Sequence, residues 1–231
     1  MLPSSTSTST SAQVARLRGK VGLYFVAALS VLAGMTDAIG FMATGDFVSF
    51  MSGNTTRLAV SLGAGELAPI LRIGAVLLAF VLGNALGVVI ARLSGRRPCP
   101  LLLIIAALLA LAAVLPSALQ LPALVSAVTA MGMINAVVEE VNGLPIGLTY
   151  VTGALSRFGR GLGRALLGER RQGWRVQLIP WTGMFVGAVL GVLLEQAFDL
   201  AALLFSALLA AALGVISLKI PRRWQLRYMP R

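Results

Sequence analysis

Two polar residues interrupt stretches of this sequence that are otherwise apolar. Asp37 lies inside a long apolar run, and Asn135 occupies the corresponding place in a later run. A carboxylate in hydrocarbon costs about 2.5–3.5 kcal/mol on insertion scales, and such residues usually face a partner or a cavity. We therefore interpret Asp37 either as a cation or proton site, or as a hydrogen-bonding residue that fixes the turn after it. Asn135 cannot ionise, so proton chemistry would belong to Asp37 alone.

Two polar segments that contain glycine form a second group of candidate site residues. Glycine permits a sharp turn and a close approach of the backbone, and the hydroxyl, amide and guanidinium groups around it could line a polar path. The arginines also have a structural interpretation, in which they snorkel to the membrane surface or, for Arg57, pair with Asp37. The candidates are Ser52, Gly53, Asn54, Thr55 and Arg57 in the first segment, and Thr152, Gly153 and Arg157 in the second.

The sequence offers little for catalysis, metal binding or a cofactor. It has no histidine, so the usual general base and the commonest metal ligand are missing. Its one cysteine, Cys99, excludes an intrachain disulfide. The two lysines, Lys20 and Lys219, stand at the edges of apolar runs, where a Ser-Lys pair within a membrane is not expected. We therefore predict that the protein is not an enzyme and binds no metal or cofactor.

The elements that must carry these residues are membrane helices. Of the 231 residues, 58% are hydrophobic and 12% are charged, whereas a soluble domain has about 25% charged residues. A transmembrane helix needs about 20 mostly apolar residues. Six apolar stretches qualify, and two weaker stretches contain the glycine segments. The apolar stretches are 21–43, 69–91, 100–118, 122–141, 177–194 and 200–220, and the weaker ones are 47–65 and 146–168.

The order of these stretches repeats, and so do individual residues within them. Gly34 matches Gly132 at an offset of 98, and Gly53 matches Gly153 at an offset of 100. Gly83 and Gly87 match Gly187 and Gly191 at an offset of 104, and each pair lies in the third stretch of its half. Small residues are frequent in any membrane helix, but three successive matches with slowly drifting offsets favour an internal repeat.

The distribution of positive charge predicts how often the chain crosses the membrane. If all eight stretches crossed, the basic loop 92–97 would lie outside, against the positive-inside bias. If the two weaker stretches dip in and return, 17 of the 19 basic residues fall on the cytoplasmic side. We therefore predict an all-α integral membrane protein with six transmembrane helices and two re-entrant or broken helical segments. The three spans of each half would form two inverted repeats.

This topology divides the chain into four parts. We predict a disordered cytoplasmic tail over 1–20, a first membrane repeat over 21–118, a second repeat over 122–220 and a basic cytoplasmic tail over 221–231. The net charge of +11 is then an orientation signal with affinity for anionic lipid headgroups, and not a nucleic-acid surface. The glycine spacings are typical of close helix packing, and they could also support a homo-oligomer.

The motifs resemble those of the YoaK-like family of bacterial membrane proteins. Residues 33–41 read AGMTDAIGF and residues 50–58 read FMSGNTTRL, which is similar to that family's "AGxxDAxGF" helix followed by a "TGN" segment. Thr152-Gly153 supplies a second "TG", and Ser52 stands where the family usually has threonine. The resemblance covers nearly the whole chain after the N-terminal tail. It implies a multi-pass protein of the bacterial inner membrane, with both termini cytoplasmic, and no established substrate.

The leading functional hypothesis is a small-solute or ion transporter, or a channel-like protein, with its site where the two repeats meet. Broken helices at matched positions in inverted halves are the usual pointer to such a site. The alternative is a membrane packing or assembly partner with no path of its own, and an intramembrane enzyme is the least favoured class. The charge of the substrate stays open, because Asp37 is negative while Arg57 and Arg157 are positive.

Overall fold

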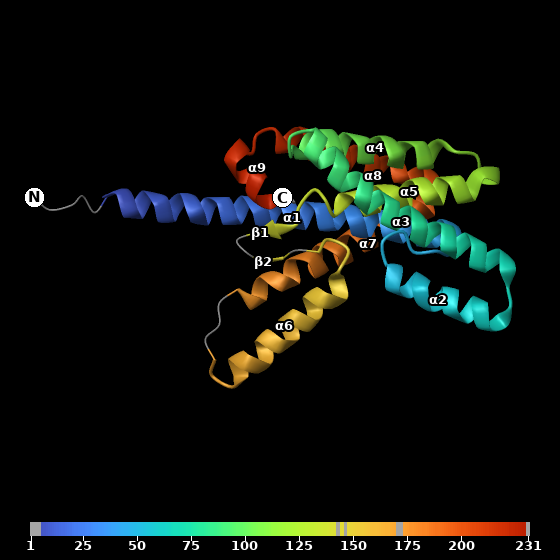
Figure 1. Cartoon of the computed structure of the whole chain (residues 1–231), viewed down its shortest axis with the longest axis horizontal. Coiled ribbons are helices and arrows are strands. Elements are labelled where there is room, and N and C mark those ends of the chain that lie inside the picture. The colour runs from blue at the N-terminus through green and yellow to red at the C-terminus, as the bar shows by residue number, and fades with distance from the viewer. Residues whose placement is uncertain (1–5, 142–143, 146, 170–172, 230–231) are drawn as a thin grey trace, which may run out of the picture.

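The computed structural model describes residues 6–141, 144–145, 147–169 and 173–229, and it is built from helices (Figure 1). One short antiparallel hairpin of strands is also present in these residues. The helices are α1 (Thr6–Thr44), α2 (Met51–Ala64), α3 (Leu67–Leu93), α4 (Pro98–Val114), α5 (Gln120–Ile134), α6 (Val151–Leu166), α7 (Leu178–Phe198), α8 (Leu203–Ser217) and α9 (Arg222–Tyr228); the 3-10 turns are η1 (Ser117–Leu119), η2 (Trp174–Gln177) and η3 (Asp199–Ala202); the strands are β1 (Glu140–Val141) and β2 (Leu144–Pro145).

The start of the described chain differs from the sequence prediction. Helix α1 begins at Thr6, so residues 6–20 are helical where a disordered tail was expected, and residues 1–5 lie outside the described part. The stretch contains no proline and no glycine before Gly19, and extending an existing helix costs much less than nucleating a new one. Within the basic tail predicted over 221–231, residues Arg222–Tyr228 form α9, which folds back onto the bundle.

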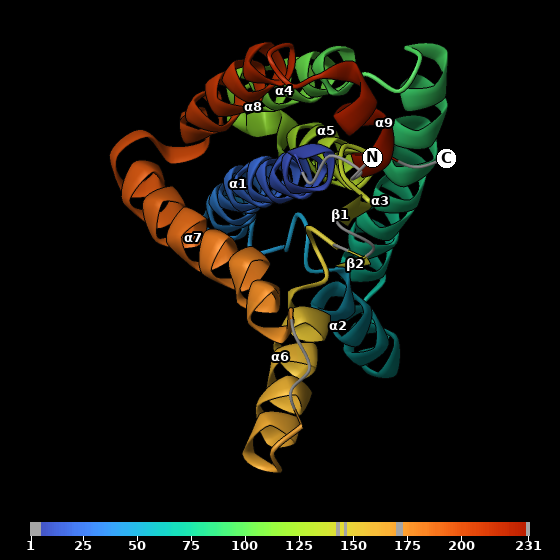
Figure 2. The same ribbon diagram turned by 90° about the vertical axis from the view of Figure 1, so that its left-hand side faces the viewer.

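Two helix pairs pack tightly, α1 with α7 and α3 with α5. Glycines make this approach possible, since small residues let membrane helices pack closely. A Cβ atom at Gly34 would overlap the backbone oxygen of Met184 and lie 2.7 Å from its carbonyl carbon. A Cβ atom at Gly132 would lie 2.5 Å from the backbone oxygen of Phe80. Helices α4 and α8 pack against each other, and α4 also packs against α5 (Figure 2).

Helices α1 and α5 run in opposite directions. The Gln120 side chain, at the start of α5, donates a hydrogen bond of 3.3 Å to the backbone oxygen of Ala43, near the end of α1. Beyond the end of α5, the Glu139 N–H donates to the Tyr228 backbone oxygen at 2.7 Å. The Tyr228 hydroxyl in turn donates to the backbone oxygen of Arg18, in the N-terminal half of α1. The start of α5 therefore lies beside the end of α1, and the end of α5 lies on the side of the N-terminal half of α1.

The chain doubles back on itself before α2. It turns at Gly45, where φ is +76°, and returns beside α1 until Val48 and Ser49 reach the side chain of Asp37. Helix α2 then runs outward again to the tight turn at Gly65 and the start of α3. There the Arg72 guanidinium donates to the backbone oxygen of Thr44 at 2.7 Å, which brings the start of α3 to the end of α1.

The outer faces of α3 and α7 expose large apolar side chains in continuous rows. A soluble monomer rarely exposes so large an apolar surface, so these rows indicate contact with lipid. Three helical stretches of the described residues are long and apolar enough to cross a membrane, namely Ala15–Thr44, Leu67–Leu93 and Trp174–Ser217. The apolar helices α4 and α5 are shorter. The exposed residues include Leu71, Leu78, Val81, Leu82, Leu86 and Val89 on α3, and Phe185, Val186, Val189, Leu190 and Leu193 on α7.

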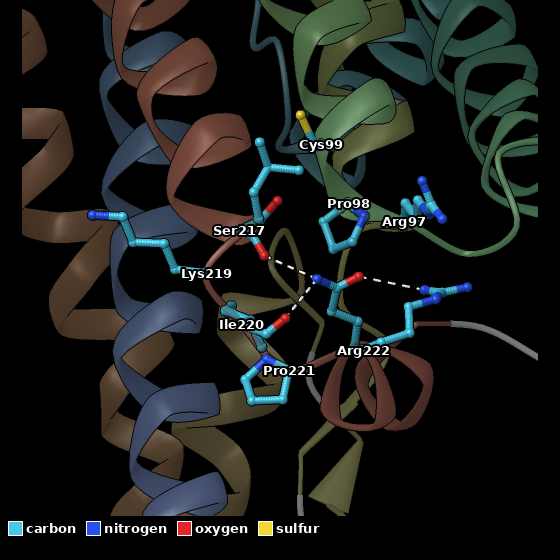
Figure 3. Close-up of a pocket in the computed structure, with 10 residues that line it drawn as sticks. Arg97, Pro98, Cys99, Ser217, Lys219, Ile220, Pro221 and Arg222 are labelled. Atoms are coloured by element: carbon cyan, nitrogen blue, oxygen red, sulfur yellow. Dashed lines mark hydrogen bonds between the residues drawn. The ribbon is translucent and has the colours of Figure 1, made fainter.

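Helix α9 ties several segments together at the end of the bundle where α1 begins. The buried Gln225 side chain donates to the backbone oxygens of Ser217 and Ile220 at 2.9 and 2.8 Å (Figure 3). The Arg96 guanidinium donates to the backbone oxygens of Leu226 and Met229. We call this the basic end of the molecule, and the end that holds Asp46 and Arg72 the opposite end.

Candidate functional site

The first turns of α2 and α6 lie close together near the middle of the molecule. Both views place the N-terminal ends of these two helices next to each other, and the helices then diverge toward opposite ends of the bundle (Figure 1, Figure 2). Each is preceded by a segment that returns from one end of the molecule into its interior, over 45–50 and over 147–150. The candidate site is therefore built from two loop-to-helix junctions.

Asp37 holds the first junction in place. Its Oδ1 atom accepts hydrogen bonds from the backbone N–H groups of Val48 at 2.8 Å and Ser49 at 2.6 Å. The Asp37 residue is 8% exposed, so its carboxylate is nearly removed from solvent. Hydrogen bonds to an ionised acceptor are roughly twice as strong as neutral ones. This geometry matches the second interpretation of Asp37, in which the residue fixes the turn that follows it.

Asn54 holds the same loop from the other side. Its side-chain amide donates to the Phe47 backbone oxygen at 2.7 Å and accepts from the Phe47 N–H at 3.2 Å. The Phe47 ring stacks on Phe41 with centroids 4.5 Å apart, and its edge meets Phe50. A Cβ atom at Gly53 would lie 2.6 Å from the Phe50 ring. A side chain at position 53 would therefore force the Phe50 ring to move.

The two glycine segments are helical, which corrects the expectation of sharp turns at these positions. Ser52, Gly53 and Asn54 lie in the first turn of α2, and Thr152 and Gly153 lie in the first turn of α6. Polar residues and glycine are tolerated in a helix end that is shielded by other helices. The turns that the sequence suggested lie a few residues earlier, in the loops that Asp37 and Asn135 contact.

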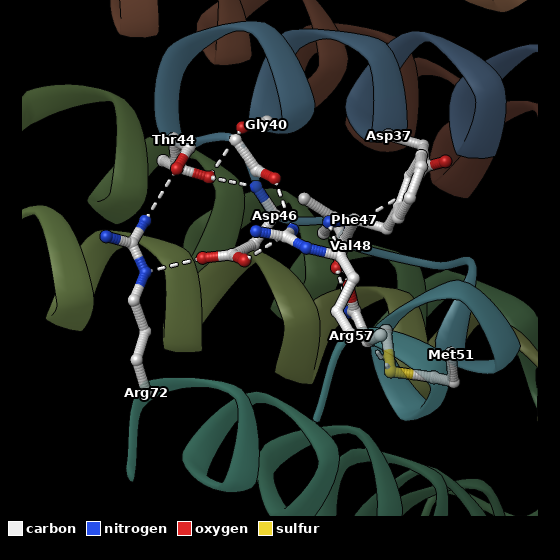
Figure 4. A network of polar contacts seen from close by, with 11 residues as sticks. Asp37, Gly40, Thr44, Asp46, Phe47, Val48, Met51, Arg57 and Arg72 are labelled. Carbon is white, nitrogen blue, oxygen red and sulfur yellow. Dashed lines mark hydrogen bonds and ion pairs between the residues drawn. The ribbon is translucent and has the colours of Figure 1, made fainter. Parts of the chain in front are cut away.

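A buried carboxylate that sequence reasoning missed organises the opposite end. The side chain of Asp46 is 3% exposed, and it pairs with Arg57 at 2.7 Å and with Arg72 at 2.5 Å (Figure 4). Arg57 also donates to the backbone oxygen of Gly45. The alternative of an ion pair between Arg57 and Asp37 is therefore replaced by a pair with Asp46. No local pattern links Asp46 to Arg72, so the sequence alone could not reveal this cluster.

The second junction is held by neutral groups. Asn135 donates to the side chain of Asn84 at 3.2 Å, and it accepts a hydrogen bond of 3.2 Å from the hydroxyl of Thr149. Thr149 precedes α6 as Ser49 precedes α2, so Asn135 and Asp37 contact equivalent loops. Asn84 was a further residue that sequence reasoning missed, although a polar side chain between Gly83 and Gly87 in an apolar helix was a usable signal.

Arg157 lies beside the first turn of α6. Its Nε atom donates to the Oε1 atom of the buried Gln177 at 2.8 Å. A Cβ atom at Gly153 would lie 3.6 Å from the Arg157 Nη1 atom, so the guanidinium group covers this face of the helix. Arg57 and Arg157, which match in sequence, therefore have different partners. The first meets a carboxylate near the opposite end, and the second meets a neutral amide.

The structure thus brings the candidate residues into two groups. Asp37 and Asn54 converge on the loop before α2, and Asn135 with Thr149 lies at the loop before α6. The side chains of Ser52, Thr55 and Thr152 are exposed, and Thr55 bonds only to the backbone of its own helix, at Met51. In the described residues, no group of three or more His, Cys, Asp or Glu side chains could hold a metal ion.

Comparison with known proteins places the chain among membrane proteins. The family model described as "Protein of unknown function (DUF1275)" matches residues 25–216. A "UPF0700 transmembrane protein" of Rhizobium meliloti (strain 1021) is 54% identical over 217 residues, which cover 94% of this chain and 95% of that protein. No solved structure matches. The YoaK-like resemblance is consistent with both findings, and with the apolar outer helices. The chain belongs to the DUF1275 family of membrane proteins.

Proposed function

We propose that this protein is a small-solute or ion transporter, or a channel-like protein, whose path passes between the first turns of α2 and α6. The observation that carries the proposal is the approach of these two helix ends on one side of α1, midway along the bundle (Figure 1, Figure 2). Short helices that end at membrane depth must be buried in protein or line a cavity. In transporters, such discontinuous helices supply their ends and unpaired backbone groups to the substrate.

Reciprocal helix contacts support two inverted repeats as the framework of this path. Cβ atoms at Gly187 and Gly191 of α7 would meet Val31 and Met35 of α1. Cβ atoms at Gly83 and Gly87 of α3 would meet Thr129 and Met133 of α5, which are the partners expected from the offsets of 98 and 104. Together with the opposite directions of α1 and α5, these contacts support a pseudo-two-fold axis in the membrane plane.

Six spans fit the same framework. The proposed spans are α1, α3, α4, α5, α7 and α8, with α2 and α6 as re-entrant helices. Helix α5 reaches a spanning length when η1 is added, and α8 does so with η3, because these turns extend the helices to residues 117–134 and 199–217. About 20 residues are needed to cross the hydrocarbon core. The positive φ of +51° at Asp199 marks the place where α7 and α8 would separate.

The charge distribution supports an orientation with both termini in the cytoplasm of a bacterium. Only Arg57 and Arg72 fall on the outer side in this topology, and both are paired with the carboxylate of Asp46. The basic end then faces the cytoplasm, as the positive-inside bias requires. This arrangement leaves no uncompensated arginine among the described residues of the opposite end.

Glu66 and Arg97, which lie just before and just after α3, test this orientation. In a background that carries Cys99→Ser, we expect Glu66→Cys to react with a membrane-impermeant maleimide added to intact cells. Arg97→Cys should react only after the cells are permeabilised, because it lies at the basic end. Both positions are exposed, so accessibility in the folded protein is the same. Labelling of Arg97→Cys from outside would overturn the six-span arrangement and restore the one with eight crossings.

Within this path, Asp37 and Asn135 would set the positions of the two helix ends. Each contacts the loop that leads into a half-helix. A substrate that moves one of these loops would therefore change the hydrogen bond between that loop and Asp37 or Asn135. The Asp37 carboxylate, the Asn84 and Asn135 amides and the Thr149 hydroxyl are the polar groups nearest these junctions. They suit a small polar solute or an ion of either charge.

Uptake into proteoliposomes tests the assignment of the site. We expect the purified protein to carry at least one member of a panel of inorganic ions, small carboxylates and small amines. Asp37→Asn and Thr149→Val should each lower that uptake at least 10-fold, because they remove a charge or a hydroxyl at a junction. Thr182→Val is the matched control, since Thr182 is exposed and bonds only within its own helix.

Two outcomes of this experiment would count against the proposal. If Asp37→Asn and Thr149→Val fold and carry substrate at the wild-type rate, the junctions are packing devices and the site lies elsewhere. If no member of the panel enters faster than it enters empty liposomes, the alternative of a packing or assembly partner is favoured. The melting temperature of each variant in detergent separates loss of transport from loss of folding.

A further inference from the structure

A pocket of about 400 Å³ opens at the basic end of the molecule, and none of its residues belongs to either junction. It lies where the start of α4, the end of α8 and the start of α9 meet (Figure 3). This volume falls within the range of roughly 300–1,000 Å³ that is typical of small-ligand sites. The pocket is distinct from the proposed transport path, which passes between α2 and α6.

The lining of this pocket carries positive charge and no carboxylate. Arg97, Lys219 and Arg222 are the charged residues of the lining, and the others are neutral. Arg97 and Arg222 lie on one side, and the Lys219 side chain extends to the other, so its ammonium would have to swing in to reach a ligand (Figure 3). Partial desolvation, followed by the nearby charges of Arg97 and Arg96, lowers the pKa of Arg222. Like charges held together without an anion are unfavourable, so this cluster is poised to gain stability when an anion binds.

The arginine at the centre of the cluster is held rigidly. Arg222 donates to the backbone oxygens of Gly95 and Arg96 and to the Oε1 atom of Gln225. Gly95 and Arg96 both have a positive φ, of +66° and +60°, which is an uncommon conformation for arginine. Gln225 is itself buried and fixed to the carbonyls at the end of α8. Two of the five N–H donors of Arg222 remain for a ligand.

The start of α4 adds to the positive potential. Pro98 and Cys99, which open this helix, line the pocket. The N-terminal end of a helix carries a partial positive charge of roughly half a unit. Rigid guanidinium donors suit the tetrahedral oxygens of a phosphate group, and a lysine ammonium adds a mobile point charge.

We propose that this pocket binds a phosphate group. The group has two chemical sources, the headgroup of an anionic phospholipid and a water-soluble phosphate. A lipid source agrees with a pocket that lies at the end of helices whose outer faces are apolar. The bound phosphate would contact Arg97, Lys219 and Arg222. It would thereby hold the start of α4, the end of α8 and the start of α9 together.

The test uses the full-length protein in detergent and follows its melting temperature as a phosphate probe is added. The probes are short-chain dioctanoyl phosphatidylglycerol and inorganic phosphate, with dioctanoylglycerol as the phosphate-free control. A ligand that binds only the folded state raises the melting temperature with its concentration. We expect saturable stabilisation by at least one phosphate probe and none by dioctanoylglycerol.

A matched pair of double variants tests the position of the site. Arg97→Gln with Lys219→Gln should weaken binding at least 10-fold, because both side chains line the pocket. Arg223→Gln with Arg227→Gln removes the same charge from exposed positions of α9 outside the lining, and binding should stay within 2-fold of wild type. Without a probe, neither double variant should lower the melting temperature, since none of these four side chains makes a hydrogen bond or ion pair within the described residues.

The outcomes distinguish the sources and can overturn the proposal. Binding of phosphatidylglycerol that millimolar phosphate does not displace identifies a lipid headgroup, and tighter binding of phosphate itself identifies a soluble ligand. Equal weakening in the two double variants would mean a diffuse charge effect and would overturn the pocket assignment. Absence of saturable stabilisation by both phosphate probes would overturn it as well.

Discussion

Gly34→Ala is expected to lower the free energy of unfolding by about 3 kcal/mol, the upper part of the usual range for overpacked sites. The added Cβ atom would overlap the backbone oxygen of Met184 and lie within 2.8 Å of its Cα atom. These are backbone atoms, so α1 and α7 must move apart to make room. Because this contact runs along the longest helix pair in the fold, separation at one point weakens the packing above and below it.

The control for this prediction is another glycine in the middle of an apolar helix. A Cβ atom at Gly74 in α3 would meet nothing within 4 Å. Gly74→Ala should therefore be neutral or stabilise the helix by up to about 1 kcal/mol. Denaturant titration of the detergent-solubilised protein, followed by circular dichroism, measures both variants. The changes in the free energy of unfolding of the two variants should differ by more than about 1 kcal/mol, which exceeds the usual error of such comparisons. A smaller difference would mean that the close contact of α1 with α7 is wrong.

Asp46→Ala is expected to destabilise the protein by about 2 kcal/mol. Breaking a fully buried ion pair costs about 3–5 kcal/mol, because a charge is left without a partner. Here the carboxylate is buried, but the side chains of Arg57 and Arg72 are 44% and 33% exposed, so solvent screens part of the loss. The variant leaves two guanidinium groups with only carbonyl partners, at Gly45 and Thr44.

Two further variants make this result specific. Glu66→Ala removes an exposed carboxylate at the same end of the molecule, and it should change stability by less than about 0.5 kcal/mol. Arg72→Met should partly restore the stability of Asp46→Ala, because it removes one of the stranded charges. An additive loss in the double variant, measured by the same denaturant titration, would show that Asp46 and Arg72 do not interact.

Much of the framework could be predicted from the sequence. Apolar stretches of sufficient length require helices, because backbone groups in lipid must be satisfied within the segment. The six apolar stretches correspond to α1, α3, α4, α5, α7 and α8, and the two weaker ones to α2 and α6. The matched glycines at offsets of 98 and 104 also meet the helices that an inverted repeat requires. The six crossings and their orientation remain predictions.

The candidate site was predicted only in part. Asp37 and Asn135 were found because a polar side chain in an apolar stretch needs a partner, and Asn54 because it lies in a polar segment beside a glycine. All three contact the loops that precede α2 and α6. The identity of each partner was not accessible, since a hydrogen bond to Val48 or Thr149 depends on how a loop returns through the bundle. The pairing of Arg57 with Asp46 in place of Asp37 has the same cause.

The sequence by itself determined that this chain is a helical membrane protein with a repeated order of apolar and polar segments. That much follows from composition and periodicity, which act locally along the chain. Only the tertiary structure decided that α9 folds back onto the bundle, that Asp46 gathers two arginines and that a basic pocket forms beside Arg222. These features join residues from 11 to more than 120 positions apart, through ion pairs and hydrogen bonds between segments that no local pattern encodes.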